Sequence, residues 1–484
     1  MFRTLILVSA FWIPCSLLSQ GIFFSENDTA ARGRIVHDVS VLTSDSLLGR
    51  EAGTKSEGKT ARYLSDQFRA IGLIPKGDEN GSYLQKFSKI RPAFKWTTRL
   101  TVNGVSYKYQ EAFGVTALSE NGKGHGQLLD GLQGLVIPEL AMDQLSGLGD
   151  LKGSFVLINL QVPDSLLKDT ALVRKLTPRY RMQSALNKGV KGVIFWNPDS
   201  RGMKELFDFE SADTLPGISL FVKVRTAMRF IRQAGSMAEV EVHIDRKTSV
   251  YSNVIGFLDN HASHSIIVGA HFDHLGVKKD GKIFSGADDN ASGTAGMLEL
   301  ARYFASHRDT LNNFLFIGFT AEEKGLWGSE YFISHPTLAL SGVKFMLNLD
   351  MIGRLGCEGN ILEIEAAGSS PAWREILRKT RHPDFSIKLV RASLPYSDHE
   401  PFYQAMIPVL FFNTGLHDDY HTTSDTKGTL NYNGMVEILK FAEGVISNSG
   451  RESQIPYRKV PWISQLSATL GYAFQAMGWV FTIH

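Results

Sequence analysis

The second half of the chain alternates short apolar runs with longer amphipathic stretches. Apolar residues are nearly continuous over 265–270, 312–320, 343–350 and 407–414, and they recur at helical spacing over 291–307, 371–380 and 432–448. Apolar runs without polar alternation predict strands that are buried on both faces, and strands that alternate with helices predict a largely parallel sheet. We therefore expect an α/β fold with a mixed, mostly parallel central sheet flanked by helices.

The first half has two textures. Helical spacing over 35–48 and 56–71 predicts two amphipathic helices, separated by the segment GREAGTK in which Gly49 and Gly53 interrupt the pattern. From about residue 93 to 247 the sequence is strand-rich and punctuated by glycine, as in GSFVLINL and VKGVIFW, with one helical stretch at 180–188. These changes of texture predict an α/β domain of residues 24–94 and 249–450, interrupted by a β-rich insertion at 95–248.

The two ends of the chain have their own patterns. Arg3 precedes an apolar run over 5–18 and then small and polar residues, which predicts a signal peptide of residues 1–20 and export to the periplasm or the extracellular space. Cys15 keeps lipoprotein anchoring as an alternative, although Trp12–Pro14 make a poor setting for it. Residues 451–484 have no assigned role. Their last part reaches the length of a membrane span but carries six polar side chains, so we expect docking on the α/β domain, with membrane contact as the alternative.

Composition excludes several classes of protein. The 484 residues are 43% hydrophobic and 21% charged with a net charge of +2, which is ordinary globular usage without a field for nucleic acid. With only two cysteines, one of them in the predicted signal, no disulfide framework is expected. The oligomeric state is not set by the sequence, and the function must come from local chemistry.

That chemistry gathers where predicted strands end. In α/β sheets, ligands bind at the carboxyl ends of the strands. These ends and the loop GADDNASG carry His271, Asp273, Asp288, Asp289, Glu322, Glu323, Asp350 and the segment 417–421, HDDYH. Carboxylates and imidazoles without thiolates suit Zn²⁺, Mn²⁺ or Co²⁺, and this set is too large for one ion. Two divalent ions about 3.5 to 4 Å apart, sharing one carboxylate, would use it fully, with Asp288 or Asp289 as the bridge.

The same residues have structural readings that involve no metal. An acid at the start of the helix at 291 could cap it, and Glu322 and Glu323 could form a solvated surface pair. Two adjacent acids exceed what a cap needs, and both glutamates follow an apolar strand directly. The metal interpretation is therefore favoured. His274, His399 and His417 are left out of the predicted ligand set, because an isolated loop histidine is more often solvated or supporting.

Five motifs in this order resemble those of the M28 family of co-catalytic zinc aminopeptidases: HFD, GADDNASG, AEE, NLDMIG and YHTTSDT. The segment from Gly49 through the second predicted helix is similar to the N-terminal helices of that family. The insertion resembles a protease-associated (PA) domain. The resemblance implies the zinc-peptidase α/β fold, peptide substrates and two divalent ions, most often Zn²⁺.

The resemblance also implies roles for individual residues. The implied metal ligands are His271, Asp288, Glu323, Asp350 and His421, with Asp288 as the bridge and a cis peptide between Asp288 and Asp289. Glu322 would be the general base, Tyr420 a donor to the developing oxyanion, and Asp273 and Asp289 supporting residues around the ligands. Arg354, Asp398 and His399 are candidates for the substrate pocket.

Two cations lower the pKa of a water held between them, so hydroxide is available near neutral pH. Glu322 could take its proton during attack on a peptide carbonyl and pass it to the departing amine. We therefore expect a secreted metallo-exopeptidase that releases N-terminal amino acids, with the metal-bridging hydroxide as nucleophile. A carboxypeptidase using Arg354 and Arg391, a glutaminyl cyclase and a non-catalytic receptor-like module are the alternatives.

Overall fold

The computed structural model describes residues 28–461, except 79–80, 95–97, 163, 168–171, 199–205, 208–213, 279, 308, 357–358 and 381–384. The predicted signal peptide, both cysteines and residues 462–484 lie outside the described residues. The chain forms two compact units, and the second unit, Lys89–Ser249, is an insertion into the first. In the part of the chain that is described, no helix combines the length and the apolar character that a membrane span requires.

The first unit is a nine-stranded sheet with helices on both faces. Its strands run in the order β1-β13-β15-β14-β16-β19-β17-β18, with β2 also pairing with β13. The strands are β1 (Ile74–Pro75), β2 (Leu84–Phe94), β13 (Ile244–Leu258), β14 (Ser265–His271), β15 (Asn313–Phe319), β16 (Val343–Leu349), β17 (Ile361–Glu365), β18 (Ser386–Leu389) and β19 (Val409–Asn413). The helices are α1 (Asp28–Leu42), α2 (Lys55–Ile71), α7 (Gly293–Ser306), α8 (Trp327–Ser334), α9 (Trp373–Lys379), α10 (His399–Gln404) and α11 (Tyr432–Gly450).

The central strands β15, β14, β16 and β19 are parallel to one another, whereas β13 and β17 are antiparallel to their neighbours β15 and β19. The sheet is therefore mixed with a parallel centre, which confirms the predicted fold class. The parallel centre matters for function, because all four of these strands end at the same edge.

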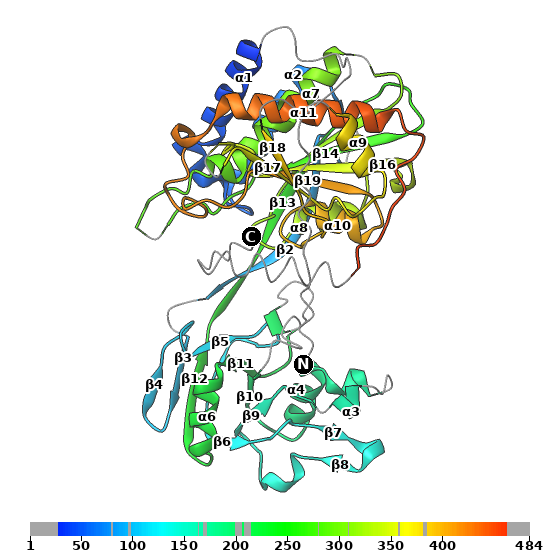
Figure 1. Ribbon diagram of the computed structural model, residues 1–484. Coiled ribbons are helices and arrows are strands. Elements are labelled where there is room, and N and C mark those ends of the chain that lie inside the picture. The colour runs from blue at the N-terminus through cyan, green and yellow to red at the C-terminus, as the bar shows by residue number, and fades with distance from the viewer. Residues whose placement is uncertain are drawn as a thin grey trace, which may run out of the picture. The chain divides into compact units, whose positions relative to one another are not determined.

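Successive side chains along each strand point to opposite faces, and both faces are buried. On β14, Ile266 and Val268 pack with α1, α2, α7, α9 and α11, whereas Ile267 packs on the other face with residues of α8 and α10. Figure 1 shows the larger set of helices, with α7 and α11, on one face and α8 with α10 on the other. Burial on both faces explains why the strand sequences read as continuous apolar runs.

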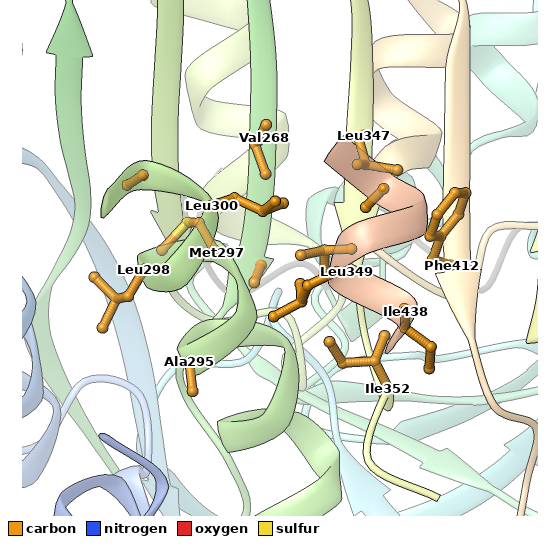
Figure 2. Packing of buried hydrophobic residues seen from close by; sticks show 14 of the residues in the cluster. Val268, Ala295, Met297, Leu298, Leu300, Leu347, Leu349, Ile352, Phe412 and Ile438 are labelled. Atoms are coloured by element: carbon orange, nitrogen blue, oxygen red, sulfur yellow. The ribbon is translucent and has the colours of Figure 1, made fainter. Parts of the chain in front are cut away.

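Figure 2 shows the main core from close by. Met297 and Leu300 of α7 and Ile438 of α11 lie among side chains of the central strands, including Val268, Leu347 and Phe412. Each of these residues is fully buried. Side chains of this kind contribute roughly 1.5–3 kcal/mol each on burial, so this layer fixes the strand ends in place.

The inserted unit has its own sheet and its own core. Its eight strands run in the order β4-β3-β12-β6-β9-β10-β11-β5, and a separate pair is formed by β7 and β8. Their bounds are β3 (Arg99–Val102), β4 (Val105–Tyr107), β5 (Phe113–Val115), β6 (Gly122–Asp130), β7 (Val136–Ile137), β8 (Met142–Asp143), β9 (Phe155–Asn159), β10 (Gly192–Trp196), β11 (Ile218–Val222) and β12 (Met237–Val242), with helices α3 (Asp164–Leu167), α4 (Pro178–Asn187) and α6 (Val224–Arg232). Strands β2 and β13 contain the two points where the chain passes between the units.

Residues 451–461, which follow α11, are irregular and packed on the first unit. Ile455 and Val460 are buried in its two cores, and the backbone N–H of Val460 donates to the Tyr403 hydroxyl at 2.7 Å. The described start of the C-terminal segment is thus docked on the α/β unit.

Candidate metal centre

Residues at or just after the ends of three neighbouring strands lie at one edge of the sheet. His271 is the final residue of β14 and pairs in register with Phe319 at the end of β15. Glu322 and Glu323 follow β15, and Asp350 follows β16, which flanks β14 on its other side. The parallel register therefore places one histidine and three acids next to one another although up to 79 positions separate them in sequence (350 minus 271).

The side chains converge on Asp289. Its Oδ1 lies 3.3 Å from His271 Nε2, and its Oδ2 lies 3.0 Å from His421 Nε2. On one side, His271 Nε2 is also 3.2 Å from Asp350 Oδ1. On the other side, His421 Nε2 is 3.2 Å from Glu323 Oε2. Asp289 thus faces two groups of donors, one made of His271 and Asp350 and one made of Glu323 and His421.

This arrangement corrects one expectation. Asp288 was expected to lie between the two groups, but its carboxylate is turned away. It accepts the backbone N–H of Gly353 at 2.6 Å and lies 3.1 Å from His417 Nε2. The cis peptide also falls one residue later than expected, between Asp289 and Asn290. Two adjacent acids look alike in a sequence, and only the loop conformation decides which of them faces the donors.

The loop is held from two sides. The Asp425 carboxylate accepts the backbone N–H groups of Asp288 at 2.9 Å and of Asp289 at 3.1 Å. The Asn290 side chain donates to the carbonyl of Leu349 at 2.9 Å, and its oxygen accepts the N–H of Gly293 at 2.8 Å. Asn290 therefore joins the loop to the end of β16, and the position of Asp289 is set by its neighbours rather than by its own side chain.

Residues in the left-handed backbone region cluster at the same edge. Ala321, Met351 and His421 have φ values of 56°, 58° and 54°. Non-glycine residues rarely adopt this region, and where they do the surrounding structure enforces it, often at functional sites. Each of these residues adjoins or is a member of the donor cluster, so the turns that aim the acids and His421 are built at some conformational cost.

The donor set fits divalent metal ions. Within the described part of the chain, two groups of side chains have ligand atoms close enough to hold an ion, namely His271 with Asp289 and Asp350, and His274 with Asp289 and Glu323. The Oδ1 atom of Asp350 is buried and accepts no hydrogen bond from the residues described. Against the effect of burial, the surrounding carboxylates raise the pKa of His271, and they raise the pKa of His421 to about 10. The cluster therefore attracts positive charge strongly, as a metal site must.

Glu322 and Asp273 lie beside the donors. Burial raises the pKa of the Glu322 carboxyl well above its usual range, against the opposing charge of His271. The backbone N–H of Glu322 donates to Asp273 Oδ1 at 3.1 Å. The Nδ1 atom of His271 is 3.2 Å from the backbone carbonyl of Asp273 and 3.8 Å from its carboxylate. The ring of His271 is thus oriented mainly by the Asp273 carbonyl, a contact that fixes which nitrogen points at Asp289.

Two residues at the site were not predicted. His274 is fully buried, and its Nδ1 lies 2.8 Å from Glu323 Oε1. Arg50 is also fully buried, and its guanidinium donates to the carbonyls of Phe272, Ser285 and Gly286 at 2.7 to 2.8 Å. The second histidine of HFDH was the available signal for His274. No spacing rule pointed to Arg50, because it lies more than 200 residues before the loops that it holds.

A cavity of about 510 Å³ opens onto the donor cluster. Its lining comprises Asp289, Glu322, Glu323, Gly325, Leu326, Asp350, Met351, Glu365, Pro395, Tyr396, Phe411, Asn413, Gly415, Leu416 and Tyr420. This volume lies within the usual range for small-ligand sites. Tyr420 lines the cavity, and its ring stacks on the ring of His421 with centroids 3.8 Å apart.

The three predicted pocket residues do not line this cavity, which corrects that expectation. Arg354 is buried and donates to Asp419 Oδ2 at 2.7 Å. Asp398 accepts the Ser329 hydroxyl at 2.6 Å, and the ring of His399 stacks on Phe411 behind the cavity wall. The hydroxyl of Ser397, the residue before Asp398, donates to Asp350 Oδ2 at 2.7 Å, so this segment supports the site from behind.

Carboxylates and imidazoles gathered at the carboxyl edge of a mixed α/β sheet, beside a cavity, are characteristic of metal-dependent hydrolases. The model of peptidase family M28 matches residues 253–445. Aminopeptidase YwaD of Bacillus subtilis is 32% identical over 424 residues, which cover 83% of this chain and 81% of the relative. The chain therefore belongs to peptidase family M28.

One further relative matches a smaller part of the chain, whereas two solved structures match most of it. Leucine aminopeptidase 1 of Sclerotinia sclerotiorum is 26% identical over 212 residues, and the match spans 55% of that relative and 40% of this chain. Among solved structures, an aminopeptidase from Aneurinibacillus sp. strain AM-1 has a TM-score of 0.57 at 20% identity over 89% of this chain and 96% of its own. BSAP, a zinc aminopeptidase from Bacillus subtilis, has a TM-score of 0.53 at 21% identity over 89% of this chain and 98% of its own. These two likenesses support the fold.

Proposed function

We propose that this protein is a metal-dependent aminopeptidase that releases N-terminal residues from peptides. The observation that carries the proposal is the lining of the cavity. Among the residues described, its charged side chains are all carboxylates, and three of them, Asp289, Glu323 and Asp350, belong to the donor groups. A carboxylate-lined cavity suits the α-ammonium group of a peptide N-terminus better than a C-terminal carboxylate.

The proposed ligands are His271 and Asp350 for one ion, Glu323 and His421 for the other, and Asp289 between them. Among the similar proteins, BSAP of Bacillus subtilis is a zinc aminopeptidase, and this favours Zn²⁺ as the metal. When bound, the ions would supply an activated water and polarise the scissile carbonyl. The geometry of the donor groups supports this assignment through the distances between Asp289 and the two histidines, 3.3 and 3.0 Å.

Glu322 is the proposed general base. It lines the cavity, it adjoins Glu323 in sequence, and it has no place in either group of donors. A carboxyl that is not a ligand can accept a proton from water and return it to the departing amine. Tyr420, which also lines the cavity, is the proposed donor of a hydrogen bond to the substrate carbonyl oxygen.

The alternatives are less well supported. A carboxypeptidase needs a cation for the substrate carboxylate, and Arg354 is instead held by Asp419 outside the cavity lining. A receptor-like module would have lost donors, whereas both groups are complete. The family match favours a peptidase over a cyclase. The inserted unit fits a PA domain in its position and β-rich content, and we propose that identity for it together with export of the mature chain.

The test uses free and N-acetylated aminoacyl p-nitroanilides, with and without a chelator, on the wild type and on Glu322→Gln. We expect cleavage of free substrates only, loss of cleavage with chelator, and a fall in kcat of at least a thousandfold in Glu322→Gln with the metal content unchanged. Glu330→Gln, an exposed glutamate eight positions later in α8, is the matched control and should keep wild-type kcat. Equal cleavage of free and acetylated substrates would refute an aminopeptidase.

A further inference from the structure

One carboxylate in the cavity has no part in the proposed chemistry. Glu365 is the last residue of β17 and only 2% of its surface is exposed. It lies in the cavity lining, two strands away from β16, the strand that Asp350 follows. Its Oε1 accepts a hydrogen bond from the Asn413 side chain at 3.2 Å, and Asn413 lines the cavity as well.

The sheet register places Glu365 on the cavity side. Glu365 pairs with Phe411 of β19, and directly paired residues project to the same face of a sheet. Val409, two residues before Phe411, belongs to the core on the face of α8 and α10, whereas Phe412 belongs to the opposite core. Glu365, Phe411 and Asn413 therefore share the face that the cavity occupies.

Apart from its carboxylates, the cavity is lined mainly by apolar residues. Met351, Leu416 and Phe411 line it, together with Leu326 and Pro395. An ionised carboxylate can accept several hydrogen bonds, so Glu365 can receive a cationic ligand in addition to the bond that it accepts from Asn413. Glu363, two residues earlier on the same face of the strand, does not line the cavity. Its Oε1 accepts a hydrogen bond from Lys388 Nζ at 2.8 Å.

We propose that Glu365 is a specificity-determining residue that selects substrates with a lysine or arginine side chain at the N-terminus. The proposal rests on the proposed aminopeptidase function and adds the substrate class to it. The apolar wall would contact the methylene stem of the side chain, and Glu365 with Asn413 would receive its cationic end. The apolar wall alone would accept an uncharged side chain of the same length equally well. Discrimination between a cationic and an uncharged side chain must therefore come from Glu365.

The dimensions agree with a long side chain. Strands β16, β19 and β17 are consecutive, so Glu365 lies two strand spacings, roughly 10 Å, from the strand that carries Asp350. A lysine side chain spans about 6 Å from Cα to Nζ, given carbon–carbon bonds of about 1.5 Å. With the length of the Glu365 side chain added, the two charges can meet while the substrate backbone stays at the metal donors. A short side chain such as that of alanine would leave this part of the cavity unfilled.

The experiment compares lysyl and norleucyl p-nitroanilides, because norleucine has nearly the length of lysine without the charge. The readout is the ratio of kcat/KM for lysine to kcat/KM for norleucine, in the wild type, in Glu365→Gln and in Glu363→Gln. The glutamine at 365 keeps the shape and can still accept from Asn413. Glu363→Gln is the matched control, since it removes a carboxylate from the same strand face outside the cavity lining.

We expect a wild-type ratio above one, a fall of at least fivefold in Glu365→Gln and no such fall in Glu363→Gln. A wild-type ratio below one overturns the proposal even if a variant fails to fold. A smaller fall in Glu365→Gln, or an equal fall in Glu363→Gln, also overturns it. Norleucine cleavage separates the two proposals, because an enzyme that cleaves norleucine without preferring lysine keeps the aminopeptidase function and loses only this inference.

Discussion

Replacement of Arg50 by methionine should destabilise the α/β unit strongly. The guanidinium is fully buried and donates four hydrogen bonds of 2.7 to 2.8 Å, to the carbonyls of Leu42, Phe272, Ser285 and Gly286. These carbonyls belong to the end of α1, the segment after β14 and the start of the loop that carries Asp289. Methionine preserves much of the apolar stem but removes all four donors.

The magnitude follows from these contacts. A hydrogen bond to a charged group contributes about 1.5–3 kcal/mol, and each buried carbonyl left without a donor costs about 1–3 kcal/mol. The four contributions do not add fully, because the segments can relax or admit water. We expect the free energy of unfolding to fall by about 4 kcal/mol, within the range of about 3–5 kcal/mol for breaking a buried charged interaction. Arg50→Lys, which keeps the charge but has only three donors, should lose roughly half as much.

The assay is unfolding in urea, monitored by far-UV circular dichroism. The transition of the α/β unit is the one that moves to higher urea concentration when metal is added. Arg62→Met, at an exposed position of α2, is the control and should stay within about 0.5 kcal/mol of the wild type. A loss below about 1 kcal/mol in Arg50→Met would refute the reasoning, since it would mean that these carbonyls do not depend on the guanidinium.

Two further predictions concern metal binding and pH. Asp289 faces both groups of donors, whereas Asp288 faces Gly353. Elemental analysis should therefore show that Asp289→Asn loses most of the bound metal and that Asp288→Asn retains it. Equal metal loss in both variants would contradict the assigned positions. Burial lowers the pKa of His399 to about 3. When the pH falls below about 6.5, this histidine therefore binds a proton in the unfolded chain but stays neutral in the folded chain. In metal-free protein, stability should therefore fall by about 1.4 kcal/mol per pH unit between about pH 6 and pH 4 through this residue, and His399→Phe should show a slope smaller by that amount; equal slopes would show that His399 does not cause it.

Sequence alone identified most of the residues that meet at the site, although not His274 or Arg50. The strands β14, β15, β16 and β19 were predicted from apolar runs within one or two residues of their observed bounds, because burial on both faces leaves a continuous apolar signal. The rule that parallel strands share a carboxyl edge then brings His271, Glu323 and Asp350 together from the order of elements along the chain. Strands β17 and β18 were not identified, and their pairing depends on contacts with a sheet already formed.

Tertiary structure decided the orientation of side chains. Asp288 and Asp289 are chemically identical, and the choice between them comes from the Asp425 carboxylate and the Asn290 side chain, which tie the loop to distant parts of the chain. Arg50 and Glu365 carry no local signal for the same reason: one acts on carbonyls more than 200 residues away, and the other gains its role from a neighbouring strand. Residue type and spacing fix which chemical groups are available, whereas burial and long-range hydrogen bonds fix where each group points.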